Sequence, residues 1–171
     1  MNYGKYAKGD GEQYQLSGDA GVGFADGRGK LHVAGQVGYQ DPTNRSGAYA
    51  GSTPNTGNFP SVGQKAFVIG DPDVNAGAVS ANTSFDFSDH LSAYATAIAS
   101  NRDIDSYAFY RSKNHNNQSA LLAQFYPDGY VPVINQYSKD RSLIAGLKGN
   151  TDGGFTWDVS YNYGYNKIDY H

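Results

Sequence analysis

The stretch Phe155-Thr-Trp-Asp-Val-Ser-Tyr-Asn-Tyr-Gly-Tyr165 decides the fold class of this chain. Its odd-numbered positions are large and apolar or aromatic, and its even-numbered positions are small or polar. A period of two places these two chemistries on opposite faces of one β-strand. A tilted strand of about 9–11 residues is also long enough to cross the hydrocarbon core of a bilayer. The apolar face therefore contacts either a protein core or lipid.

A similar alternation recurs along the rest of the chain, and helical periodicity is almost absent. Asp26-Gly-Arg-Gly29 has the composition of a tight hairpin turn between two such segments. One segment has an ambiguous phase, because Leu91-Ala93-Ala95-Ala97 and Tyr94-Thr96-Ile98 both qualify as its apolar face. The predicted strands cover residues 12–25, 30–40, 74–87, 91–110, 140–148 and 155–170.

The lengths of the predicted connections alternate short, long, short, long and short. The two long segments, 41–73 and 111–139, are rich in polar residues and contain Gly and Pro. In an up-and-down meander this order places every short turn at one end and every long loop at the other. Bacterial outer-membrane barrels have this asymmetry, with short periplasmic turns and long extracellular loops. We therefore expect an all-β antiparallel meander of about six strands in a Gram-negative outer membrane.

The composition excludes several other classes of protein. The 171 residues include no Cys, so neither a disulfide framework nor a cysteine metal site is expected. The net charge is -3 and the 13 Lys and Arg residues are scattered, unlike the basic patch of a nucleic-acid binder. No run of about 18 apolar residues predicts a transmembrane helix. The residues that follow Met1 are polar and do not resemble a signal peptide.

The number of predicted strands is too small for a closed membrane barrel. The smallest single-chain barrels have about eight strands, and open sheet edges are not tolerated in lipid. Either the chain is a piece of a larger barrel, or several copies assemble to close one. We favour a piece, because residues 1–171 begin in an expected loop and end while still strand-like.

Four segments carry a resemblance to a known family. They read Gly4-Lys-Tyr6 to Gly9-Asp-Gly11, Asp41-Pro-Thr-Asn-Arg-Ser-Gly47, Gly70-Asp-Pro-Asp73 and Phe125-Tyr-Pro-Asp-Gly-Tyr-Val-Pro-Val-Ile-Asn135. In order and spacing they resemble a middle section of the β-barrel of a TonB-dependent outer-membrane receptor. The resemblance covers nearly the whole chain.

The resemblance implies a transmembrane barrel of about 22 strands, a plug domain inside it, and energy from the inner-membrane TonB complex. Such receptors take up scarce nutrients such as ferric siderophores, haem, cobalamin or oligosaccharides. Residues 1–171 lack a plug, a TonB-contacting segment and the aromatic C-terminal residue that ends such barrels. We therefore expect a partial barrel that contacts outer-membrane lipid, the remaining barrel and the plug, and TonB through the missing N-terminal part. It is not expected to transport alone.

The long loops hold the candidate ligand-binding residues, because loops on a rigid scaffold carry specificity. Aromatic side chains in them can stack on a sugar or an aromatic chelator, and Arg and Asn side chains can make polar contacts. The candidates are Tyr49, Phe59, Phe67, Tyr126 and Tyr130 for stacking, with Arg45, Arg111 and Asn114 as polar contacts. An equally strong alternative is that these aromatic residues pack the loops against one another.

No motif for catalysis or for a cofactor is present, so the chain is not expected to be an enzyme. The histidines His32, His90, His115 and His171 lack the spacing of metal ligands. The pairs Asp71/Asp73 and Asp103/Asp105 offer oxygen ligands suited to Ca²⁺, but the preference of Asp for turns explains them better. The glycines near residue 25 are not followed by a phosphate-binding signature, and no nucleophile elbow occurs.

Two other interpretations stay open at this point. One is a small self-associating, porin-like barrel that passes solutes passively. The other is a soluble β-rich binding module whose apolar strand faces form a protein core. The period of two in the predicted strands and the alternation of short and long connections together favour lipid on the aromatic side of 155–165. Asp158 and Asn162 then face a solvated lumen.

Overall fold

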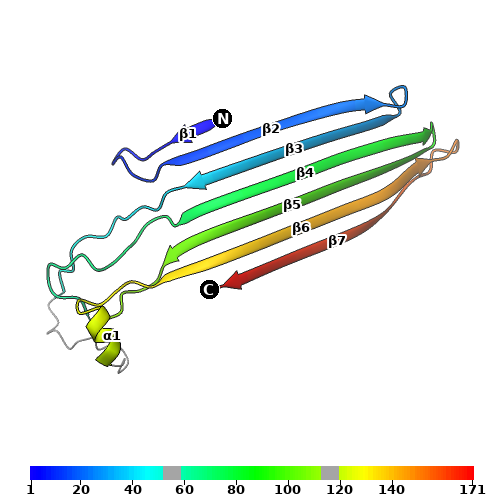
Figure 1. Cartoon of the computed structure of the whole chain (residues 1–171). Coiled ribbons are helices and arrows are strands. Elements are labelled where there is room, and N and C mark those ends of the chain that lie inside the picture. The colour runs from blue at the N-terminus through cyan, green and yellow to red at the C-terminus, as the bar shows by residue number, and fades with distance from the viewer. Residues whose placement is uncertain (52–58, 113–119) are drawn as a thin grey trace.

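The computed structural model describes residues 1–51, 59–112 and 120–171. This part of the chain forms one antiparallel sheet whose strands lie side by side in sequence order (Figure 1). The expected all-β meander is thus confirmed, with seven strands instead of about six. The elements are β1 (Asn2–Gly4), β2 (Gln13–Phe24), β3 (Gly29–Gln40), β4 (Asp73–Ser88), β5 (Leu91–Tyr107), α1 (Ala120–Phe125), β6 (Val133–Asn150) and β7 (Thr156–Tyr170).

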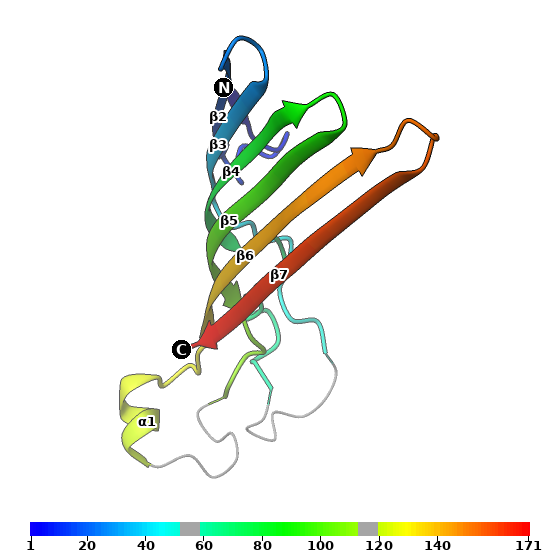
Figure 2. The same ribbon diagram turned by 90° about the vertical axis from the view of Figure 1, so that its right-hand side faces the viewer.

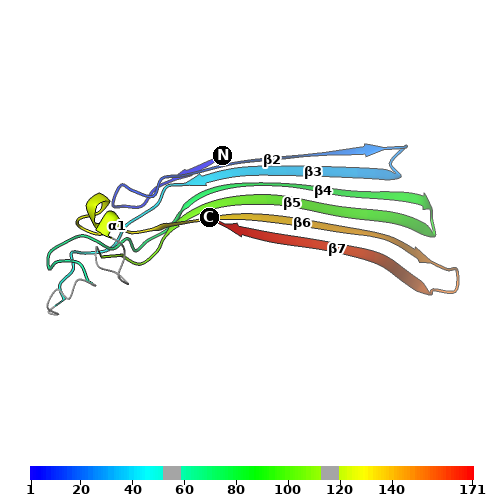
Figure 3. The ribbon, with the colours of Figure 1, turned by 60° about the horizontal axis from the view of Figure 1, so that its bottom comes forward.

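The short connections β2–β3, β4–β5 and β6–β7 all lie at one end of the sheet, and the longer connections lie at the other (Figures 1 and 3). The predicted segregation of loops by length is therefore confirmed. The sheet is a single layer that twists and curves along its length, with α1 beside the long loops (Figure 2). These two ends are named the turn end and the loop end below.

Several boundaries differ from those that the sequence predicts. β6 begins at Val133 and not near residue 140, because its first residues complete the ladder with β5 as far as the pair Tyr107 and Val133. β5 ends at Tyr107, three residues before the predicted limit. β1 and α1 are not predicted at all, because three and six residues are too short to show a period.

The pairing register puts most of the apolar residues of six strands on one face of the sheet. Directly opposed residues of an antiparallel pair point to the same side. One row across the sheet contains Tyr163, Leu143, Ala97, Ala81, Val33 and Ala20. The next row, on the opposite face, contains Asn162, Ile144, Thr96, Asn82, His32 and Gly21. We term these two sides the apolar face and the polar face.

The register also resolves the phase of β5. Ala95 lies between Thr83 and Ala145 on the apolar face, so the series Leu91-Ala93-Ala95-Ala97 belongs there. Tyr94, Thr96 and Ile98 consequently lie on the polar face. Neighbouring strands decide this phase, because the two series within β5 are similarly apolar when the strand is considered alone.

Neither face of the sheet is covered by protein. Ala66 is the one buried hydrophobic residue of the described chain, and it lies in a loop. On the apolar face, Val159 and Tyr161 are 68% and 65% exposed. The total accessible surface is 11510 Å², whereas a compact protein of this mass exposes about 8,200 Å². The apolar face is therefore not a core within this chain.

One tyrosine links three strands on the polar face. Tyr94 of β5 lies directly opposite Gly146 of β6, and its hydroxyl donates a 2.8 Å hydrogen bond to Asp158 of β7. A Cβ atom at Gly146 would lie 2.6 Å from the ring carbon Cζ of Tyr94. The missing side chain at Gly146 therefore lets the ring cross β6 and reach β7.

We expect Gly146→Val to displace the Tyr94 ring and break its hydrogen bond with Asp158. The free energy of unfolding should fall by about 1–3 kcal/mol, the usual cost of an overpacked contact. Urea titration of the chain folded in detergent micelles measures this change. Gly164→Val is the matched control, because a Cβ atom there has nothing within 4 Å. Equal effects of the two substitutions would contradict the role of Gly146.

Candidate functional site

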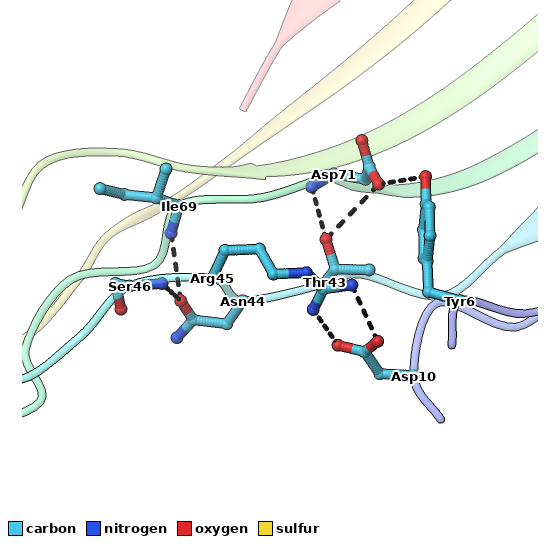
Figure 4. Close-up of polar contacts among 8 residues, drawn as sticks. All are labelled: Tyr6, Asp10, Thr43, Asn44, Arg45, Ser46, Ile69 and Asp71. Atoms are coloured by element: carbon cyan, nitrogen blue, oxygen red, sulfur yellow. Dashed lines mark hydrogen bonds and ion pairs between the residues drawn. The ribbon is translucent and has the colours of Figure 1, made fainter. Parts of the chain in front are cut away.

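Three segments that are far apart in the sequence meet at the loop end of the sheet (Figure 4). The backbone NH of Thr43 donates to the carbonyl of Asp71 at 3.0 Å, and the NH of Asp71 donates to Thr43 Oγ1 at 2.8 Å. The Tyr6 hydroxyl donates to the Asp71 carboxylate at 2.9 Å. Thr43 is only 4% exposed, so this contact is one of the few buried points of the molecule.

A charged pair lies beside this contact. The guanidinium of Arg45 donates to both carboxylate oxygens of Asp10, and the contact between Nη2 and Oδ1 is 2.9 Å. Arg45 Cζ also lies 5.3 Å from the centre of the Tyr6 ring, within the range of a cation–π contact. We term Tyr6, Asp10, Thr43, Arg45 and Asp71 the loop clasp. It ties the β1–β2 connection to both ends of the β3–β4 connection.

The ionisation of the clasp follows from these contacts. The hydrogen bond from Arg45 holds the pKa of Asp10 below its ordinary value of 3.8, and the same bond raises the pKa of Arg45. The hydrogen bond to Asp71 raises the pKa of the Tyr6 hydroxyl. Each shift favours the protonation state that makes the contact, so the clasp stays intact throughout the neutral range.

Both long loops continue the pairing of the strands that they connect. In the β3–β4 connection, the NH of Arg45 donates to the Ile69 carbonyl at 2.7 Å, and the NH of Tyr49 donates to the Gln64 carbonyl at 2.9 Å. In the β5–β6 connection, Arg111 and Tyr130 exchange two backbone hydrogen bonds of 2.7 and 2.8 Å. The described parts of the loops are therefore hairpin-like extensions of the sheet.

Aromatic rings join these two extensions to each other. The ring of Phe67 lies 6.1 Å from that of Tyr49 in its own loop and 6.2 Å from that of Tyr110 in the other loop. The Tyr110 hydroxyl and the Gln64 side-chain amide both donate to the carbonyl of Asp128, at 2.7 and 3.0 Å. The two long loops thus form one connected surface at the loop end.

The ligand-binding candidates fall into three groups rather than one site. Arg45 belongs to the clasp. Tyr49, Phe59 and Phe67 form a cluster that we term the aromatic stack: the rings of Tyr49 and Phe59 are parallel within 2° at 6.2 Å, and Phe67 is tilted against Tyr49. Arg111, Tyr126 and Tyr130 lie in the β5–β6 connection, with 4.7 Å between the rings of Tyr126 and Tyr130. Asn114 lies outside the described residues. The aromatic residues do pack the loops together, and their contact with a ligand stays a prediction.

Most members of the clasp are absent from the candidates that the sequence suggests. Tyr6, Asp10, Thr43 and Asp71 form no local motif in the sequence. Their partners are distant: Asp10 lies 35 residues from Arg45, and Tyr6 lies 65 residues from Asp71. One feature of the sequence could have indicated the clasp: all of its residues lie in three of the four short segments that carry the resemblance. The fourth segment lies outside the clasp, in the β5–β6 connection. It contains Gly129, whose φ of 77° and close approach to Tyr110 both require a residue without a side chain.

The paired carboxylates have protein partners in the described chain. Asn135 Nδ2 donates to both Asp103 and Asp105 at 2.8 Å, and Asp71 is held by the clasp. Among the described residues, no group of three or more His, Cys, Asp and Glu side chains is placed to hold a metal ion. Two histidine rings contact other side chains, His32 with Asp19 and His90 with Asn150. His171 pairs with Asn135 through backbone hydrogen bonds, and His115 lies outside the described residues.

In the part of the chain that the structure describes, no helix has the length and apolar character needed to cross a membrane. Comparison with protein-family models, with curated proteins and with solved structures gives no match. The fold itself defines an open, antiparallel, seven-stranded meander with one polar and one apolar face.

The clasp predicts a loss of order at the loop end in acid. Because the pKa of folded Asp10 is lowered, the stabilisation is complete above its ordinary pKa of 3.8 and is lost as pH falls through the lower folded value. We expect the hydrogen-exchange protection of residues 5–12 to fall over that acidic range. Protection factors corrected for intrinsic exchange measure this effect.

Asp10→Asn should produce the same low protection at neutral pH, because it removes the charge that Arg45 contacts. Asp26→Asn, in the turn between β2 and β3, is the control and should leave residues 5–12 protected. Full protection of these residues in Asp10→Asn at neutral pH would show that the ion pair does not hold the loop.

Proposed function

We propose that the sheet is a section of an outer-membrane β-barrel, with the apolar face against lipid and the polar face toward the lumen. One observation carries this proposal: apolar side chains from six strands align in a single uncovered band. Exposed apolar patches larger than a few hundred Å² are rare on soluble monomers and mark interaction sites. Lipid contact explains a band that extends over the whole width of the sheet.

The height of the band fits a bilayer. On β5 the apolar run covers residues 91–99 and is followed by Asn101, Asp103 and Asp105 on the same face. Such a run is about 26 Å long at about 3.3 Å per residue, and about 20 Å tall at the usual tilt, close to the apolar band of known barrels. Arg141 lies at its border, and its guanidinium reaches Asn101 at 2.9 Å, as expected of a cation at a membrane boundary.

Aromatic residues lie at both borders of the band. Membrane barrels have such girdles where the hydrocarbon meets the headgroups, because Tyr and Trp combine an apolar body with a polar tip. The turn-end girdle consists of Phe24, Phe85, Phe87 and Trp157, and the loop-end girdle consists of Tyr3, Tyr14, Tyr39 and Tyr165. The tyrosines of the two girdles thus all lie at the loop end, whereas Tyr161 and Tyr163 lie within the band.

The biological role that we propose is a part of a TonB-dependent receptor for active uptake of a scarce nutrient. The resemblance of the four short segments supports this role, and three of these segments meet in the loop clasp. A siderophore, haem, cobalamin or an oligosaccharide would be recognised at the long loops. The plug, the remaining barrel and the contact with TonB would come from outside residues 1–171, so the section is not expected to transport alone. No enzymatic activity is proposed.

The two alternatives differ in what covers the sheet. A soluble binding module needs a core, and Ala66 is the sole buried hydrophobic residue of the described chain. A self-associating porin-like barrel is consistent with the free edges: β1 covers only Gln13–Gln15 of β2, and no strand of the described chain lies on the outer side of β7. In lipid both edges need partners, which either the remaining receptor or further copies would supply.

Cross-linking of the chain folded in micelles separates these two sources of partner strands. A receptor section predicts no discrete closed oligomer of the 171 residues, because its edges match other strands. A self-associating barrel predicts one ladder that ends at a fixed number of copies. A discrete ring would therefore replace the receptor proposal with the porin-like alternative.

A pair of neighbouring residues on β6 tests the membrane proposal. Leu143 and Ile144 are both aliphatic and are 39% and 36% exposed, but they lie on opposite faces. We expect Leu143→Arg to weaken insertion into lipid vesicles by about 2–4 kcal/mol, the cost of Arg on the lipid face near the midplane. Ile144→Arg should have little effect, because it enters a solvated lumen. Urea titration of folding into vesicles measures both, and equal effects would contradict the assignment of the faces.

A further inference from the structure

A cavity of about 520 Å³ lies largely on the polar face near the loop end, between β2 and β5. This volume is within the range of sites for small ligands. The cavity belongs to neither the loop clasp nor the aromatic stack. It also lies apart from the ligand-binding candidates of the loops, none of which lines it.

The register explains why the polar face is depressed at this place. One row across the polar face contains Gln15, Gly38, Ala76 and Arg102, and the next contains Gln36, Ala78 and Ser100. The small residues form a floor over β3 and β4. The long side chains of β2 and β3 form one wall, and Arg102 with Ile98 forms the other.

The polar groups of the cavity are mainly side-chain amides. Asn2, Gln15 and Gln36 form a chain of contacts of 3.4 and 3.3 Å. Gln13 and Gln40 lie opposite each other at the loop end of the cavity. Within the described chain, the side chains of Gln13, Gln40 and Arg102 make no hydrogen bond to another residue, so their donors and acceptors are available.

The charge of the lining restricts the ligand. Arg102 is the only charged residue that lines the cavity, although Asp19, Asp140 and Asp158 lie elsewhere on the same face. A strongly anionic ligand would need several cations, and a cationic ligand would need carboxylates. Amides both donate and accept, as hydroxyl groups do. The chemistry is therefore that of an uncharged ligand rich in hydroxyl groups.

We propose that this cavity binds a neutral oligosaccharide. The amides would contact the sugar hydroxyls, and the floor of Ala76 and Ala78 with Ile98 would pack against the apolar faces of the rings. The inference rests on the proposed function, because the polar face is a path for a solute only if it lines a barrel. It narrows the nutrient to a carbohydrate and places a binding site below the long loops.

The test uses the full chain folded in detergent micelles, with the β-sheet circular dichroism signal as the check of folding. Maltohexaose and xylohexaose are the neutral probes, and hexagalacturonate and chitosan hexamer are the charged probes of similar size. Calorimetric titration should give a Kd for a neutral probe at least tenfold lower than for either charged probe. Equal binding of neutral and charged probes, or no binding of a neutral one, would overturn the proposal.

Three variants locate the binding within the cavity. Gln36→Ala and Gln40→Ala should each raise the Kd roughly three- to tenfold, the effect of one lost hydrogen bond. Ala78→Leu should abolish binding, because it fills the floor while leaving every amide in place. Gln136→Ala is the matched control: it removes an amide from the polar face outside the cavity and should leave the Kd unchanged. Loss of binding in this control, or retention of binding in Ala78→Leu, would place any bound sugar elsewhere.

Failure of this inference and failure of the proposed function give different results. If Leu143→Arg alone disturbs insertion and no neutral sugar binds, the barrel proposal stands and the carbohydrate site is wrong. If Leu143→Arg and Ile144→Arg disturb insertion equally, the membrane assignment is wrong whatever the chain binds.

Discussion

The strict register between neighbouring strands is the constraint on which the rest of the structure depends. A slip of one residue in any ladder would move every following side chain to the other face. The ladders from β2 to β7 hold one phase throughout, and their only shift lies between Asp86 and Ser88 at the turn end. Local sequence therefore creates an alternation in each strand, and pairing adds these alternations into one surface.

The same pairing organises the loops. Backbone ladders continue past β3 and β4 through Arg45 and Ile69, and past β5 and β6 through Arg111 and Tyr130. Side chains then join the extensions sideways, at the clasp and at Phe67 and Tyr110. The loop end is thus ordered by contacts other than the strand ladders. It buries little apolar surface and depends mainly on hydrogen bonds, ring contacts and the ion pair of the clasp.

The long strands and their hairpins were predictable because each contains its own period and its own turn residues. β1, α1 and the first residues of β6 were not, because their structure comes from contacts with distant partners. The phase of β5 was likewise undecidable alone, since Ala95 and Thr96 are both small. At the loop end the sequence indicated useful residue types but not their grouping. Arg45 meets Asp10 only because two loops return to the same edge of the sheet.

The uncovered outer side of β7 has a consequence for biogenesis. This strand contains no proline and few charges, and its backbone groups are free along one side. In water such an edge is a template for uncontrolled strand addition. The meander itself can form hairpin by hairpin from local contacts, but its last edge has no local partner. In the barrel that we propose, the outer side of β7 pairs with another strand, so this edge has to be shielded from other chains until that pairing forms.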